Sequence, residues 1–181
     1  MIKLYICGLK LKIINLKIMK KLLLVIAMVA AGFTANAQEA NGQTAKGKWV
    51  IEANTGSATT GNTSFSLATS NGNTEWSIGL DGGYFVADDL AVKAGLGYRD
   101  NGFADAFAYK IGAEYYIGSQ FPVSVDFTGD TNSDLKWLGL QAGYAWFLGE
   151  NVSLKPALRY NVGLDDQDGV FQGVVGFALY F

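Results

Sequence analysis

The chain has 181 residues, a formal net charge of −2, one cysteine and no histidine. The lack of histidine excludes a Ser-His-Asp catalytic triad. Gly is abundant, with 23 residues, whereas Pro occurs twice. No heptad or 3.6-residue apolar pattern runs through the chain, so we expect few helices.

Residues 1–37 are predicted to be a cleavable signal peptide. Every charge in them is a lysine, and an apolar run at residues 22–31 is followed by small residues that include Ala35 and Ala37. This order of basic, apolar and small segments is typical of secretory signal peptides, with cleavage expected after Ala37. The apolar run is too short for a spanning helix, which needs about 20 residues. We expect translation to start at Met19, which would make residues 1–18 an upstream extension. The alternative to a cleavable signal peptide is an uncleaved membrane anchor.

Cleavage would make the remaining chain, residues 38–181, strongly acidic. It would remove six lysines and the single cysteine, Cys7, and change the net charge from −2 to −8. A chain of this kind has no disulfide framework. Its acidity argues against binding to nucleic acid. Its length suits a single domain.

Eight stretches alternate between apolar residues and small or polar residues, as amphipathic β-strands do. They are residues 48–54, 74–86, 90–99, 107–117, 121–128, 138–146, 152–162 and 170–181. Strands of about ten residues are long enough to cross a bilayer. Residues 55–73 form a polar loop in this prediction, and the alternation of Phe65 and Leu67 would allow the flanking strands to extend into it.

The connections between these strands are of two kinds. Short turns that follow aromatic strand ends recur within residues 84–92, 115–123 and 146–154. More polar and more variable connections lie between them, at residues 100–102, 129–133 and 163–169. Short turns alternating with variable loops are typical of the two ends of an outer-membrane barrel.

The aromatic residues gather at the two ends of the predicted strands. A soluble β-protein could explain each strand taken alone, but it explains these two clusters poorly. Two aromatic girdles around an aliphatic band are expected where a barrel crosses both membrane interfaces. The short-turn cluster contains Tyr84, Tyr115, Phe121, Tyr144, Trp146 and Phe181, and the loop-end cluster contains Trp76, Tyr98, Phe107, Tyr160 and Phe171.

Charges of both signs fall on the opposite, inward face. An eight-stranded barrel is only wide enough for side chains to fill it, and buried charges must pair. We therefore predict a salt-bridged interior plug; the alternative is a narrow polar channel. The predicted network comprises Glu52, Asp81, Lys93, Lys110, Glu114, Asp126, Lys155 and Arg159, and the wider inward set adds Lys48, Glu75 and Arg99.

Other chemistry has little support. The spacing Asp130-x-Asn132-x-Asp134 matches the start of a calcium loop, but Leu135 replaces the sixth-position glycine and Gln141 the closing glutamate. A solvated acidic loop is the better interpretation. No residue spacing nominates a catalytic set, so we predict neither an enzyme nor a bound cofactor or metal.

The terminal strand, residues 170–181, carries bulky apolar residues on one face and ends on Phe181. With the signal peptide and the aromatic short turns, it resembles the small Gram-negative outer-membrane β-barrel proteins, the porin-like family of the OmpX and OmpA membrane-domain type. The resemblance implies that Phe177, Leu179 and Phe181 act as a signal for the barrel-assembly machinery. It also implies contact with outer-membrane lipids and lipopolysaccharide, and loop-mediated binding to an extracellular ligand or surface.

The sequence thus predicts an all-β fold: an eight-stranded antiparallel up-and-down transmembrane β-barrel over residues 38–181, in the cell outer membrane. The short turns, with Asp89, Ser119 and Glu150, are expected to face the periplasm, and residues 55–73 to face outside. The expected function is non-enzymatic, either structural or adhesive. The alternatives are a passive porin-like channel for small solutes and a secreted, soluble, lipocalin-like ligand carrier.

Overall fold

A computed structural model describes residues 42–57, 60, 62–70, 72–132, 135–164 and 167–181. They belong to one compact unit, Glu39–Phe181. The predicted signal peptide, with Ala35, Ala37 and Met19, lies outside the described residues. Within the described part of the chain, no helix has the length and apolar character needed to cross a membrane.

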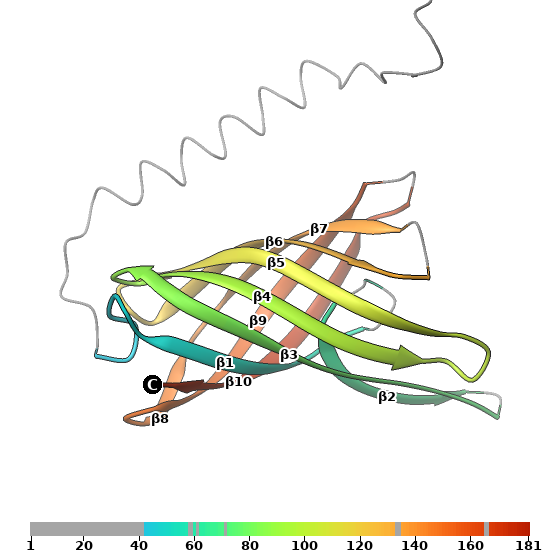
Figure 1. Ribbon diagram of the computed structural model, residues 1–181, viewed down its shortest axis with the longest axis horizontal. Coiled ribbons are helices and arrows are strands. Elements are labelled where there is room, and N and C mark those ends of the chain that lie inside the picture. The colour runs from blue at the N-terminus through green and yellow to red at the C-terminus, as the bar shows by residue number, and fades with distance from the viewer. Residues whose placement is uncertain (1–41, 58–59, 61, 71, 133–134, 165–166) are drawn as a thin grey trace, which may run out of the picture. The chain divides into compact units, whose positions relative to one another are not determined.

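The described residues form ten β-strands in one sheet that closes into a barrel (Figure 1). Closure occurs at β10, which pairs antiparallel with β9 on one side and with β1 on the other. The strands are β1 (Trp49–Thr55), β2 (Ser64–Ser70), β3 (Asn73–Ala87), β4 (Leu90–Asp100), β5 (Asp105–Ile117), β6 (Phe121–Asp130), β7 (Lys136–Gly143), β8 (Trp146–Gly149), β9 (Val152–Gly163) and β10 (Val170–Tyr180).

The expectation of a closed all-β barrel is confirmed, but the predicted count of eight strands is wrong. One additional strand is β2, which lies in the stretch that was predicted to be a loop. The other arises because the predicted strand 138–146 is divided into β7 and β8, which both pair with β9. Across this break the backbone still bonds to both neighbours: Tyr144 N–H donates to Pro156 O on β9 at 3.0 Å, and Ala145 N–H donates to Gln120 O, just before β6, at 2.7 Å.

The first part of the barrel also departs from a strict up-and-down antiparallel order. β1 pairs with the second half of β3, through Glu52 and Asp81 among others, whereas β2 pairs with the first half. The two strands meet in a short parallel contact at Asn54 and Ser64. Two short strands, β1 and β2, therefore pair with the same edge of β3, because the connection between them leaves the barrel wall.

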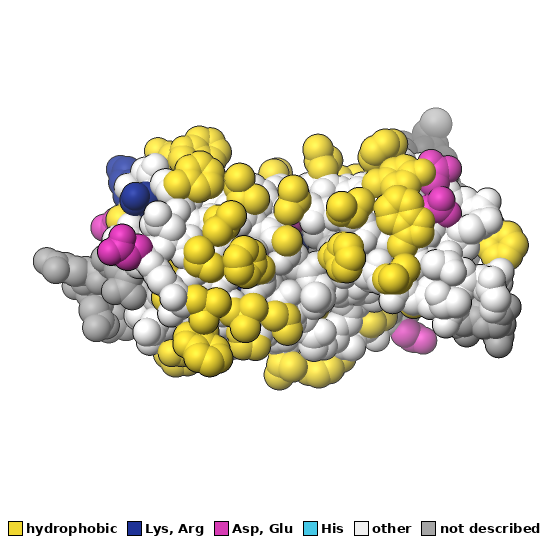
Figure 2. Space-filling view, turned by 90° about the horizontal axis from the view of Figure 1, so that it is seen from below, with side chains coloured by type: hydrophobic (Ala, Val, Ile, Leu, Met, Phe, Trp, Pro, Cys, Tyr) yellow, Lys and Arg dark blue, Asp and Glu magenta, His cyan; other side chains and the backbone are white. Residues whose placement is uncertain are grey.

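Large apolar side chains point outward from the barrel wall. Leu67 on β2 is 70% exposed, Leu96 on β4 is 73% exposed and Phe171 on β10 is 66% exposed. Figure 2 shows apolar side chains across the middle of the surface, with most of the visible charges near its two ends. A protein in water rarely exposes so continuous an apolar surface, whereas a barrel wall in lipid requires one.

Aromatic rings meet in pairs near both ends of the wall. At the short-turn end the ring centroids of Trp49 and Tyr84 lie 4.9 Å apart. At the loop end Tyr98 lies between Trp76 and Phe107, at centroid distances of 5.6 and 5.3 Å. These outward rings lie where the sequence predicts two aromatic girdles.

Candidate functional site: the barrel interior

The candidate site is the interior of the barrel, where strand alternation turns one face of each strand inward. All eight residues of the predicted network are buried: each is 8% exposed or less. They come from β1, β3, β4, β5, β6 and β9. Segments far apart in sequence therefore contribute to one polar core.

Four of these residues form an alternating ring of charges. Lys155 Nζ lies 2.6 Å from Glu52 Oε2 and 2.7 Å from Glu114 Oε1. Lys93 Nζ lies 2.7 Å from Glu52 Oε2 and 3.5 Å from Glu114 Oε1. The Tyr116 hydroxyl donates to Glu114 Oε1 at 2.8 Å and accepts a hydrogen bond from Lys155 Nζ at 3.0 Å. Each buried charge in this four-charge ring therefore has partners of opposite sign, as burial requires.

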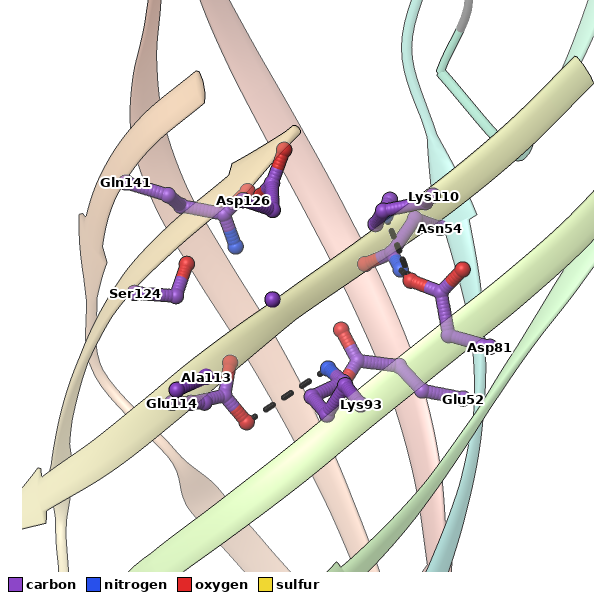
Figure 3. A pocket seen from close by; sticks show the side chains of 11 residues that line it. Glu52, Asn54, Asp81, Lys93, Lys110, Ala113, Glu114, Ser124, Asp126 and Gln141 are labelled. Atoms are coloured by element: carbon purple, nitrogen blue, oxygen red, sulfur yellow. Dashed lines mark hydrogen bonds and ion pairs between the residues drawn. The ribbon is translucent and has the colours of Figure 1, made fainter. Parts of the chain in front are cut away.

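A second ion pair lies above the ring, toward the loops. Lys110 Nζ lies 2.5 Å from Asp81 Oδ2, which also accepts a hydrogen bond from Asn54 Nδ2 at 3.1 Å. The other oxygen, Asp81 Oδ1, accepts a hydrogen bond from the Thr63 hydroxyl. Figure 3 shows this pair beside the contact between Lys93 and Glu114.

A third pair joins β6 and β9. Arg159 donates from Nη1 and Nη2 to the two oxygens of Asp126, at 2.7 and 2.6 Å. Its Nε donates to Asn161 Oδ1 at 2.8 Å. A two-pronged pair of this kind combines charge with fixed geometry.

Between these groups the interior leaves almost no space. The cavity in Figure 3, lined by residues such as Glu52, Asp81 and Gln141, has a volume of about 10 Å³. That is about the minimum needed for one water molecule. The side chains therefore fill the middle of the barrel, as expected for a barrel of this size.

The short-turn end is closed by an apolar cluster, which we call the collar. Three rings form its centre: Phe85 lies 5.8 Å from Tyr116 and 6.4 Å from Tyr180, measured between centroids. The collar residues are Val50, Phe85, Ala91, Tyr116, Ala145, Ala178 and Tyr180, with Phe147 packed against them.

The segment before β1 folds over this same end. The Thr44 hydroxyl, fully buried, donates to Asp89 Oδ1 at 2.5 Å, and Asp89 N–H donates back to Thr44 O at 2.8 Å. Ser119 in the next turn donates to Asp89 Oδ2 at 3.2 Å. Asp89, predicted only as a turn residue, thus holds the segment against the end of the barrel, and Ser119 orients the Asp89 carboxylate.

At the loop end, part of the β1–β2 connection lies inside the barrel. Thr60 and Thr63 are fully buried. Thr60 O accepts a hydrogen bond from the Thr128 hydroxyl on β6 at 2.9 Å, and a Cβ at Gly79 would lie 2.7 Å from the Thr63 backbone. Part of the loop predicted at residues 55–73 therefore lies inside the barrel, because glycine on β3 leaves room for it.

Two assignments at the ends of the interior also need correction, those of Lys48 and Asp130. Lys48, predicted to point inward, is exposed. Glu75 keeps its predicted place on the inward face of β3, where it is half-buried at the loop end. Asp130, predicted to lie in a solvated loop, ends β6 and is 7% exposed, with Arg99 Nη2 at 2.9 Å from its Oδ2. Extending the alternation of Asp126 and Thr128 by one step would have identified Asp130 as inward.

A closed barrel with an apolar wall and a charged, filled interior defines the class as an outer-membrane-type β-barrel. No family model matches the chain, and no curated protein matches its sequence. Among solved structures, the chain is similar to the N-terminal β-barrel domain of Pseudomonas aeruginosa OprF, with a TM-score of 0.53 and 18% identity over 75% of this chain and 98% of that one. A de novo designed transmembrane β-barrel gives a TM-score of 0.40 at 15% identity, over 75% of this chain and 92% of that one. The likeness to the OprF domain supports the fold alone.

Proposed function

We propose that this chain is a non-enzymatic, integral protein of the Gram-negative outer membrane, in which a closed barrel supports contact-making loops. The apolar outward wall and the paired aromatic rings at its two ends support the membrane setting. The fold likeness to the OprF domain is consistent with it.

The filled interior is the observation that favours a scaffold over a channel. A solute would have to pass the collar, the four-charge ring and the inserted Thr60 and Thr63. Separating Lys155 from its two carboxylates inside the barrel would leave buried charges uncompensated, which is costly. This cost argues against a resting porin-like channel.

The same arrangement argues against a soluble, lipocalin-like carrier. A carrier of apolar ligands needs an apolar cavity and a polar surface. Here the arrangement is reversed, since Glu52 and Lys155 are buried whereas Leu96 and Phe171 are exposed.

Localisation and partners form part of the proposal. Export would use the predicted signal peptide, with assembly signalled by Phe177, Leu179 and Phe181, whose side chains are 45%, 42% and 56% exposed on or next to β10. Outer-membrane lipids and lipopolysaccharide would contact the apolar wall. The loops would contact an extracellular ligand or surface, with no cofactor.

Single-channel conductance in planar bilayers tests the proposal. We expect refolded wild-type protein to give no steady conductance, and we expect Glu114→Ala to remain silent because the collar still closes the short-turn end. The shift in gel mobility on heating, measured on the same samples, confirms that the barrel is folded. A steady, large conductance from folded wild-type protein would favour the channel instead.

A further inference from the structure

A hollow lies at the loop end of the barrel, outside the filled interior. It has a volume of about 320 Å³ and lies between the β2–β3 hairpin and the β4–β5 turn. Its lining residues are Ala68, Asn73, Glu75, Asn101 and Phe103. This volume is at the lower limit for ligand pockets, so it suits one or two side chains of a partner.

Phe103 stands at the edge of this hollow with its side chain 82% exposed, more than any other large apolar residue described. The turn that carries it is held by its own hydrogen bonds. Asn101 Oδ1 accepts from the N–H groups of Phe103 and Ala104 at 3.0 and 2.8 Å, and Asp100 Oδ1 accepts from Gly102 N–H at 2.7 Å. A ring presented by an ordered turn loses little conformational entropy on binding, as binding anchors require.

Glu75 supplies a carboxylate beside this ring. Among the described residues, its side chain takes part in no ion pair or hydrogen bond, although it is half-buried at the mouth of the barrel. The surrounding end is acidic, because its described charges comprise five carboxylates and two basic groups. They are Glu75, Asp100, Asp105, Asp130 and Asp168, against Arg99 and Lys136.

We propose that this hollow binds a basic side chain, arginine or lysine, from an extended peptide segment of a partner protein. The cation would pair with the Glu75 carboxylate while it lies against the face of Phe103, an arrangement stabilised by both charge and the ring quadrupole. The acidic surroundings favour a basic partner over an acidic one. This inference rests on the proposed function, since it gives the loop end a class of partner.

Fluorescence anisotropy tests the inference with the full barrel in phosphatidylcholine nanodiscs. The probe is a fluorescein-labelled Gly-Arg repeat peptide, and its matched control replaces each arginine with neutral citrulline. Phe103→Ala and Glu75→Gln change the hollow. The matched controls are Leu164→Ala and Asp168→Asn. They change one apolar and one acidic residue that are exposed in the β9–β10 loop and do not line the hollow.

We expect the arginine peptide to bind and the citrulline peptide not to bind. Phe103→Ala and Glu75→Gln should each weaken binding about two- to five-fold, whereas the two controls should leave it unchanged. If Asp168→Asn weakened binding as much as Glu75→Gln does, the peptide would be held by the overall negative charge of the loop end and not by the hollow, which would overturn the inference. Undiminished binding to Phe103→Ala would overturn it too. A dimer in detergent that Phe103→Ala dissociates would make a second copy the occupant, which also contradicts the proposal. Absence of peptide binding in a barrel that conducts no current would refute this inference and leave the proposed function standing.

Discussion

Arg159 on β9 and Asp126 on β6 form a two-pronged ion pair across an intervening strand. Their hydrogen bonds are 2.7 and 2.6 Å long. The strand between them is β7, where Gly139 pairs with Asp126 on one side and Asn161 on the other. A Cβ at position 139 would lie 2.5 Å from Asp126 Oδ1. The ion pair therefore depends on the lack of a side chain at Gly139.

Gly139→Ala should lower the free energy of unfolding by about 1–3 kcal/mol, because the new methyl group overpacks the buried pair. Urea unfolding in phosphatidylcholine vesicles measures this change. Gly173→Ala is the matched control: Gly173 faces outward on β10, and a Cβ there would meet nothing within 4 Å. The control should change stability by less than about 0.5 kcal/mol. Equal effects of the two variants would contradict the role given to Gly139.

Glu114→Ala should destabilise the barrel by about 3–5 kcal/mol, because it leaves Lys93 and Lys155 with Glu52 as their one remaining carboxylate in the four-charge ring. The same urea experiment measures the loss. The double variant Glu114→Leu with Lys155→Met removes one charge of each sign, so it should recover most of the stability. If the double variant were as unstable as the sum of the single ones, charge compensation would not be the cause.

An arginine on the outward wall should be costly for a different reason. Leu140 points outward from β7, where it pairs with Val125 and Tyr160. Leu140→Arg should cost about 2–4 kcal/mol in a bilayer, because its charge faces lipid. The control, Leu164→Arg, places an arginine in the exposed β9–β10 loop. Urea unfolding in vesicles should show almost no change in its free energy of unfolding. A cost at position 164 equal to that at 140 would argue against lipid around β7.

Phe181 contributes to barrel closure through its backbone as well as its side chain. Phe181 O accepts from Trp49 N–H at 2.8 Å, and Phe181 N–H donates to Trp49 O at 3.0 Å. Deletion of Phe181 removes both bonds, whereas Phe181→Ala keeps them. If the side chain is an assembly signal, both variants should reach the outer membrane at lower levels in cells, while refolded Phe181→Ala should remain nearly as stable as wild type. Normal outer-membrane levels of Phe181→Ala would reject the signal.

The direction of insertion can be measured with single cysteines at exposed positions on either side of β9. Asp168→Cys lies in the β9–β10 loop and Glu150→Cys in the turn before β9. A membrane-impermeant maleimide applied to intact cells should label position 168 and spare position 150, because short turns face the periplasm in such barrels. Labelling of both positions after permeabilisation is the control. The reverse pattern on intact cells would invert the topology.

Much of the barrel could be predicted from local pattern. Alternation with a period of two assigns each residue to one face of a strand, so Glu114 and Arg159 could be placed inward and Leu140 outward from sequence alone. The aromatic strand end at Tyr84 marked the boundary of β3, which ends at Ala87, whereas Trp146, predicted to end a strand, begins β8. The predicted faces of these residues agree with their observed burial.

Other features depended on contacts between distant parts of the chain. Alternation does not reveal that Arg159 meets Asp126 across Gly139, or that Lys155 lies between Glu52 and Glu114, because those contacts depend on how strands are staggered when the sheet closes. The insertion of Thr60 and Thr63 likewise depends on space beside Gly79, which exists only once β3 and its neighbours are in place. Local periodicity therefore determined which side chains face the interior, whereas barrel closure decided their partners, since closure brings together residues far apart in sequence.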